Sequence, residues 1–113
     1  MTLALITGSS GHAGATLIRE LINQNYKVRC IDFDNDHRAY EGLDVDLIEG
    51  DITKKDSLWK IFEDVDVVFH TAAFICLDRR YKDLIRNVNV NGTRNVCDAV
   101  SYTHLTLPTR LLV

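Results

Sequence analysis

Residues 6–14 read ITGSSGHAG, and this stretch decides the fold. Its three glycines, Gly8, Gly11 and Gly14, are spaced three residues apart, after an apolar run at 3–6 and before an amphipathic pattern at 12–23. A strand that turns on glycines into a helix is typical of a phosphate site, because the N–H groups and the dipole at the start of the helix favour an anion. We expect Gly8 to permit a tight bend, Gly11 to let a pyrophosphate approach the backbone, and Gly14 to let the helix pack closely on the strand.

An acidic residue follows at the distance that a dinucleotide site requires. Asp32 ends the second apolar run, 18 residues after Gly14. A carboxylate there can accept hydrogen bonds from both hydroxyls of an adenosine ribose and repels a 2′-phosphate, so the sequence predicts NAD, with NADP less favoured. The alternative is a solvated acid in a loop between strand and helix. The sequence has no Gly-Lys-Ser/Thr motif, which disfavours an NTPase.

Short apolar runs alternate with longer amphipathic stretches over residues 1–99. Continuous apolar strands joined by crossover helices predict an α/β fold, a partial Rossmann fold whose parallel sheet has about four strands in the order 3-2-1-4 and helices on both faces. A polar stretch at 34–42 reads as weakly structured, and Thr-Lys-Lys-Asp at 53–56 resembles a capping box. The predicted strands lie at 3–7, 28–32, 45–49 and 65–71, and the predicted helices at 12–23, 53–62 and 81–99.

The bulk properties limit the classes of protein. A chain of 113 residues holds one domain at most, and its 46% hydrophobic content suffices for a core. A net charge of -3 gives no basic field for nucleic acid or anionic lipid, and no apolar stretch approaches the ~20 residues of a membrane span. The three cysteines are widely separated, which favours reduced thiols, and no metal site is predicted. We expect a soluble, cytoplasmic protein with neither nucleic-acid nor membrane partners.

The glycine-rich stretch also carries a family resemblance. Thr-Gly-Ser-Ser-Gly-His-Ala-Gly at 7–14 resembles the T-G-x-x-G-x-x-G fingerprint of the short-chain dehydrogenase/reductase superfamily. Three further segments, LIEGDI at 47–52, VFHTAA at 68–73 and NVNGTRNV at 89–96, resemble its extended branch, the NAD-dependent epimerase/dehydratase family. Members of this branch include dihydroflavonol-reductase-like, sugar-nucleotide epimerase and 3β-hydroxysteroid-dehydrogenase-like proteins. The resemblance covers residues 1 to about 99 in the correct order.

The resemblance implies a set of cofactor contacts. Asp51 and the residue after it would lie against the adenine, and the small Ala72 and Ala73 would let the cofactor approach the fourth strand. Asn89 would lie near the active site and support a proton relay, as the only catalytic contribution of this chain. The alternatives are an ordinary acid before a helix, close packing of the alanines, and a solvated helix face. The full set of predicted cofactor-binding residues is Gly8, Ser10, Gly11, His12, Ala13, Gly14, Asp32, Asp51, Ile52, Thr71, Ala72, Ala73 and Asn89.

Two further residues have structural explanations. His70 lies among apolar residues, so we expect a core histidine with satisfied hydrogen bonds rather than a catalyst. Gly92 costs ~1 kcal/mol in a helix relative to alanine, so we expect close backbone packing there.

The chain lacks the catalytic residues of the family. Hydride transfer there uses a tyrosine as general acid/base in Y-x-x-x-K, with a Ser or Thr that orients the substrate oxygen. The residues four positions after Tyr26, Tyr40, Tyr81 and Tyr102 are Cys30, Asp44, Ile85 and Thr106, and none is lysine.

We therefore predict the NAD-binding portion of an oxidoreductase or epimerase that acts on a small hydroxyl or carbonyl substrate, such as a sugar nucleotide, a flavonol-like or a steroid-like compound. The parent protein would dimerise through the helix at 81–99, as the resemblance implies, and the fragment itself would be inactive. One alternative is a non-catalytic, dinucleotide-sensing relative, and another is a stand-alone interaction domain with a native tail.

The last residues break the pattern. From Val100 the chain reads VSYTHLTLPTRLLV, which has no helical period and no convincing strand. Residues 100–109 match the translation of a transposase-type sequencing adapter, so we expect residues 1–99 to form the Rossmann part and 100–113 to be a non-native read-through tail. The strand at 65–71 would then be an unpaired edge, which predicts poor solubility.

Overall fold

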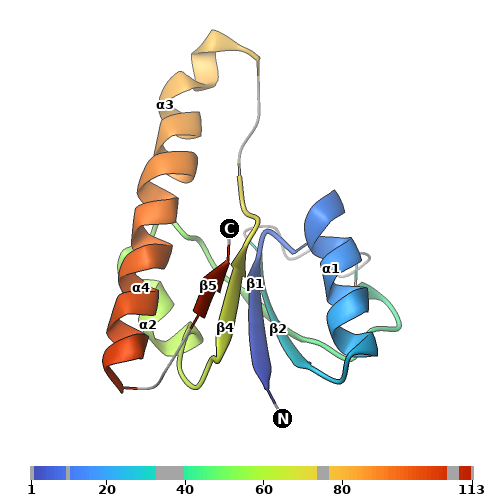
Figure 1. Ribbon diagram of the computed structural model, residues 1–113. Helices are drawn as coiled ribbons and strands as arrows, with labels where there is room; N and C mark the ends of the chain where they lie inside the picture. The colour runs from blue at the N-terminus through green and yellow to red at the C-terminus, as the bar shows by residue number, and fades with distance from the viewer. Residues whose placement is uncertain (1, 10, 33–39, 74–76, 107–109, 113) are drawn as a thin grey trace.

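The computed structural model describes residues 2–9, 11–32, 40–73, 77–106 and 110–112 (Figure 1). Along the chain, strands alternate with helices as the apolar pattern predicts, except that the second and third strands follow one another in the described residues. The strands are β1 (Leu3–Thr7), β2 (Lys27–Asp32), β3 (Asp46–Glu49), β4 (Val67–His70) and β5 (Arg110–Leu112). The helices are α1 (His12–Asn23), the 3-10 turn η2 (Lys55–Ser57), α2 (Leu58–Ile61), the 3-10 turn η3 (Arg79–Tyr81), α3 (Lys82–Arg86), the π-helix η4 (Asn87–Gly92) and α4 (Thr93–Thr106).

The strands form one parallel sheet in the order β3-β2-β1-β4-β5. In the central register, Ile6 of β1 lies opposite Cys30 of β2 and Phe69 of β4. The predicted order 3-2-1-4 is confirmed, and a fifth strand extends it. Because all strands run in the same direction, their carboxyl ends meet at one edge, which is where open α/β sheets bind ligands.

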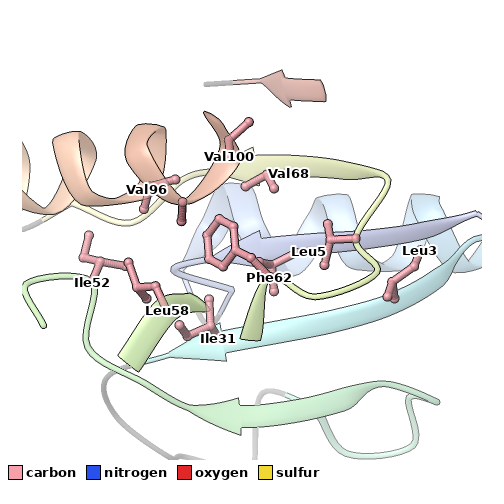
Figure 2. Packing of buried hydrophobic residues seen from close by; sticks show 11 residues of the cluster. Leu3, Leu5, Ile31, Ile52, Leu58, Phe62, Val68, Val96 and Val100 are labelled. Carbon is pink, nitrogen blue, oxygen red and sulfur yellow. The ribbon is translucent and has the colours of Figure 1, made fainter. Parts of the chain in front are cut away.

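Helices cover both faces of the sheet, as predicted (Figure 1). Successive side chains of a strand point to opposite faces, so Leu3 and Leu5 of β1 join the core beneath α2 and α4, whereas Ala4 and Ile6 join the core beneath α1. Figure 2 shows the first of these cores, in which the fully buried Phe62 lies between the sheet and α4. The central strand β1 is thus apolar and buried on both faces, which explains its continuous hydrophobic run.

The predicted helix at 53–62 is shorter and starts differently. It begins as the 3-10 turn η2 and continues as the four-residue α2. The capping box is wrong, because the Thr53 hydroxyl donates to Asp51 Oδ1 at 2.6 Å instead of capping the helix. The strands also differ slightly: β2 begins one residue earlier than predicted, β3 one residue later, and β4 covers only Val67–His70.

The predicted helix at 81–99 is part of one uninterrupted helical run, formed by η3, α3, η4 and α4, and its middle part, η4, is a π-helix. This segment, η4, changes the helical register, so the expected apolar stripe splits: Val96 is fully buried, whereas Tyr81 and Leu84 are more than 40% exposed. Figure 1 shows α3 beyond the carboxyl ends of the strands. At Gly92 a Cβ would lie 2.6 Å from the Ile52 side chain, so the helix backbone packs closely there, as expected, and its neighbour is this side chain.

The expectations for the end of the chain differ from the structure most. Helix α4 does not end near residue 99 but runs to Thr106, and Val100 is buried in the core. The Tyr102 ring meets the Trp59 ring edge-on, with centroids 4.8 Å apart. Strand β5 pairs with β4, with Val67 opposite Arg110 and Phe69 opposite Leu112. The prediction that β4 is an unpaired edge is therefore wrong, because the residues excluded from the fold supply its neighbour.

Candidate functional site

The turn after β1 is held against the end of β4. Gly8 has a φ of +66°, and a Cβ there would lie 2.5 Å from Ala72 Cα and 2.7 Å from Ala72 N. Neither the dihedral angle nor the contact tolerates a side chain, so the fold itself requires this glycine. The Gly8 N–H donates to the Ile31 carbonyl at 3.2 Å, and the Gly11 N–H donates to the Gly8 carbonyl at 3.1 Å.

The other two glycines of the turn differ from each other. A Cβ on Gly14 would lie 2.7 Å from the Gly8 carbonyl oxygen and 2.8 Å from Ser9 Cα, so the first turn of α1 packs on the glycine turn rather than on the strand itself. Gly11 is exposed, with φ −72° and ψ 171°, and its nearest neighbour would be the Gly8 oxygen at 3.4 Å. Packing therefore explains Gly8 and Gly14 but does not explain a glycine at position 11.

Gly8 and Gly11 open onto a cleft of about 600 Å³ at the carboxyl edge of the sheet. This volume lies within the range of about 300–1,000 Å³ of small-molecule sites. The cleft runs along the carboxyl ends of β1, β2, β3 and β4, and includes the point between β1 and β4 where the strand order reverses. Eight of the residues predicted from the sequence line it, namely Gly8, Gly11, Asp32, Asp51, Ile52, Thr71, Ala72 and Ala73.

Five of the predicted residues do not line the described cleft. Ser10 and the side chain of His12 lie outside the described residues. Ala13 is exposed and Gly14 is buried behind the turn. Asn89 lies half-buried in η4, and the residues that reach the cleft from this helix are others.

Seven lining residues were not predicted. The helical segment reaches the cleft through Leu84 of α3 and through Asn87 and Val88 of η4, and a uniform helical period does not show the π-helical register at 87–92. Only Gly50 carried a signal, because a glycine after a strand marks close approach: a Cβ there would lie 2.6 Å from Ile31 Cδ1. The seven residues are Ile31, Gly50, Thr53, Lys54, Leu84, Asn87 and Val88.

Asp51 has a structural role as well as a place in the cleft. Its Oδ1 accepts hydrogen bonds from the backbone N–H of Thr53 at 2.9 Å and from the Thr53 hydroxyl at 2.6 Å. These bonds order the turn that leads from β3 to η2. The ordinary role that the sequence left open is thus present, and it leaves the carboxylate at the cleft wall.

Asp32 is held by a residue that the sequence pattern did not indicate. The Tyr40 hydroxyl donates to Asp32 Oδ2 at 3.1 Å and lies 2.5 Å from Ser9 Oγ. Burial raises the pKa of Tyr40 to about 12 and the pKa of the neighbouring Cys30 thiol to about 11. Both groups therefore keep their protons near neutral pH.

His70 is a buried structural residue, as expected. The Thr7 hydroxyl oxygen accepts the N–H groups of Thr71 and Ala72 at 3.1 and 3.2 Å, so its single proton is left for His70 Nδ1 at 2.7 Å. Nε2 then carries the proton of the neutral ring and donates to the Thr93 hydroxyl at 2.8 Å. Burial lowers the pKa of His70, which favours this neutral form. The network fixes the end of β4 against the glycine turn.

The site fits a dinucleotide on the grounds of this structure alone. The exposed backbone at Gly11 faces a cleft wide enough for a nucleotide, the start of α1 favours phosphate, and a carboxylate lies at the end of β2. A parallel sheet with this turn at its switch point defines the dinucleotide-binding Rossmann class.

Comparison with known proteins narrows the class to a family. Residues 5–107 match the model of the 3-beta hydroxysteroid dehydrogenase/isomerase family, so the chain belongs to this family. It is 38% identical over 91 residues to the sterol demethylase protein B of Methylococcus capsulatus, which covers 80% of this chain and 28% of that protein. It is 33% identical over 105 residues to a 3 beta-hydroxysteroid dehydrogenase/Delta 5→4-isomerase of Mycobacterium tuberculosis, with coverages of 84% and 27%. The chain therefore spans little more than a quarter of these relatives.

Solved structures agree with this placement. The Bordetella bronchiseptica enzyme WbmG in complex with NAD superposes with a TM-score of 0.83 and 27% identity, over 96% of this chain and 36% of that one. A short-chain dehydrogenase/reductase superfamily protein of Agrobacterium tumefaciens with bound NAD gives a TM-score of 0.78 and 29% identity, over 89% and 29%. The resemblance to the extended short-chain dehydrogenases is confirmed.

The described residues contain neither a membrane-spanning helix nor a cluster of metal-binding side chains. No described helix is both long enough and apolar enough to cross a membrane. In the same ranges no group of three or more His, Cys, Asp or Glu side chains is arranged to hold a metal ion.

Proposed function

We propose that this chain is the NAD-binding portion of an oxidoreductase or epimerase that transfers hydride to or from a hydroxyl or carbonyl substrate. The observation that carries the proposal is Gly11: the fold does not require a glycine there, and the position faces the cleft. A glycine that packing does not explain points to a ligand that approaches the backbone. The bound cofactor supplies the hydride chemistry, and this chain supplies its binding and orientation.

In the proposed arrangement each part of the cleft holds one part of the dinucleotide. The N–H groups at the start of α1 bind the pyrophosphate, and Asp32 accepts hydrogen bonds from the adenosine ribose. Asp51 and Ile52 lie on the adenine side, and Thr71, Ala72 and Ala73 border the path toward the reactive end. For the substrate, membership of the family supports a steroid-like alcohol or ketone over a sugar nucleotide or a flavonol-like compound.

The proposed cofactor preference is tested by calorimetry on the 113-residue chain with NAD and NADP. We expect tighter binding of NAD, because the Asp32 carboxylate repels a 2′-phosphate. Asp32→Ala should weaken NAD binding and relieve the rejection of NADP. A wild-type chain that binds NADP more tightly than NAD would show that Asp32 does not contact the ribose.

The proposed division of labour is tested by turnover. We expect the 113-residue chain to give no NAD-dependent oxidation of a 3β-hydroxysteroid, because no tyrosine is followed four residues later by lysine. Measurable dehydrogenase activity would place the general acid/base within this chain and contradict the proposal.

A further inference from the structure

Tyr40 lies at the junction of the two cofactor-binding elements. Its ring is 6% exposed and belongs to the core between α1 and the sheet, with Ile6, Ile18 and Cys30. Its hydroxyl leaves this core at the polar end and reaches Asp32 on one side and Ser9 on the other. A residue eight positions after Asp32 thus bridges the glycine turn and the acid at the end of β2.

The direction of these hydrogen bonds follows from the groups involved. A carboxylate only accepts, so the single phenol proton of Tyr40 goes to Asp32 Oδ2. The Ser9 hydroxyl, 2.5 Å away and fully buried, then donates to the phenol oxygen. The chain of donors runs from Ser9 through Tyr40 and ends on the carboxylate. The high pKa of Tyr40 keeps the phenol a donor at neutral pH.

A core residue with no other task would not need this hydroxyl. Phenylalanine would fill the same volume among apolar neighbours without burying a polar group, which must find a partner or cost free energy. In Tyr40 that group binds the carboxylate that faces the cleft. The Tyr40 ring is rigid and buried, so the hydroxyl at its end holds the Asp32 carboxylate in one orientation.

We infer that Tyr40 is a positioning residue that sets the choice between NAD and NADP, by holding the Asp32 carboxylate toward the ribose and tying it to the phosphate turn through Ser9. The inference rests on the proposed role of Asp32. With the Tyr40 hydrogen bond the carboxylate repels a 2′-phosphate from a defined position, and loss of this bond weakens that restraint.

The test is the ratio of the dissociation constants for NADP and NAD, measured by calorimetry on the 113-residue chain. Tyr40→Phe keeps the ring and removes only the hydroxyl. We expect about tenfold weaker NAD binding, and a ratio lowered by a similar factor, from the loss of one hydrogen bond to a charged group. Tyr26→Phe is the matched control, because it removes a hydroxyl from a ring that packs on the same core but precedes β2, at the opposite end of that strand from Asp32, and it should leave the ratio unchanged.

Asp32→Ala separates the inference from the proposed function. If Asp32→Ala lowers the ratio and Tyr40→Phe leaves it at the wild-type value, the role of Tyr40 is overturned while the role of Asp32 stands. If Asp32→Ala leaves the ratio unchanged, the proposed ribose contact fails and the inference fails with it. Tyr40→Phe should have no further effect on the ratio in the Asp32→Ala chain, and an undiminished effect there would show that Tyr40 does not act through Asp32.

A second variant covers the case in which Tyr40→Phe does not fold. Ser9→Ala removes the donor at the other end of the chain of hydrogen bonds and leaves the Tyr40 ring in place. A lowered ratio in this variant supports the inference, and a wild-type ratio overturns it. Circular dichroism and thermal melting of each variant establish which ones are folded.

Discussion

Replacing the glycines of the turn one at a time should separate binding from folding. Gly11 and Gly14 lie three residues apart on the same turn, yet their surroundings differ. A Cβ on Gly14 would lie 2.7 Å from the Gly8 oxygen and 2.8 Å from Ser9 Cα, and both are backbone atoms that cannot rotate away. Among the described residues that are not its chain neighbours, a Cβ on Gly11 would meet the Gly8 oxygen at 3.4 Å, which is ordinary contact. Gly14→Ala should therefore strain the fold, and Gly11→Ala should not.

The structure sets the size of both effects. Overpacking of this kind costs about 1–3 kcal/mol, or roughly 4–12 °C in Tm for a domain of this size. At Gly11, alanine stabilises the fold by restricting the unfolded chain, but it destabilises the start of α1 because alanine is a poorer N-cap than glycine. Each effect is below about 1 kcal/mol, and the two oppose each other. Stability should thus stay near the wild type. The new methyl group would stand at the proposed pyrophosphate contact, and loss of one charged hydrogen bond there should weaken NAD binding about 10–100-fold.

The assay combines melting by circular dichroism with calorimetric titration of NAD on the same samples. Gly11→Ala should melt with the wild type and bind NAD at least about tenfold more weakly, and Gly11→Val should abolish binding without unfolding the sheet. Gly14→Ala should melt earlier and, where still folded, bind NAD. If folded Gly11→Ala and Gly11→Val chains bind NAD with wild-type affinity, the turn is not the pyrophosphate site. A Gly14→Ala chain with unchanged Tm would refute the packing argument.

Three further outcomes follow from the core, the buried histidine and the last strand. Phe62→Ala should lower the free energy of unfolding by about 3–5 kcal/mol in urea denaturation, because Phe62 is fully buried and its truncation leaves a cavity in the core. Burial lowers the pKa of His70, so its contribution to stability should be complete above the unfolded pKa of about 6.5 and should be lost as the pH falls from there through the folded pKa. Urea denaturation should therefore give a lower free energy of unfolding at pH 5 than at pH 7.5, and this difference should be smaller in His70→Gln. Truncation after Thr106 removes β5 and leaves β4 unpaired, so the shortened chain should associate in gel filtration and melt earlier than the full chain.

The sheet could be predicted from the sequence because each of its features is local in the chain. A strand buried on both faces needs a continuous apolar run, and a crossover helix needs an amphipathic one, so the alternation in residues 1–99 defines the order of the first four strands. The glycine turn and Asp32 could be placed on the same grounds, since both lie at strand ends. The cleft then follows from the topology, because parallel strands end at one edge.

The rest depends on contacts between distant residues that no periodic pattern contains. Tyr40 lies in the polar stretch read as weakly structured, and it joins Asp32, eight residues before it, to Ser9, which is 31 residues away. The π-helix changes the register within a stretch that looks uniformly helical, so Asn87 and Val88 line the cleft in place of Asn89. In both cases tertiary packing decides between local alternatives that the sequence leaves nearly equal.

The end of the chain shows how little sequence a parallel edge strand requires. Strand β5 spans Arg110–Leu112 and pairs through backbone groups, which almost any residue except proline supplies. Helix α4 likewise continues past Val100, because burial of Val100 and the ring contact of Tyr102 with Trp59 extend it without a strong helical period. Secondary structure at these positions is therefore compatible with a native and with a foreign origin alike. The origin of residues 100–113 stays a prediction, and it turns on the source DNA: an adapter sequence at these codons supports a read-through tail, whereas a genomic reading frame that encodes the same residues contradicts it.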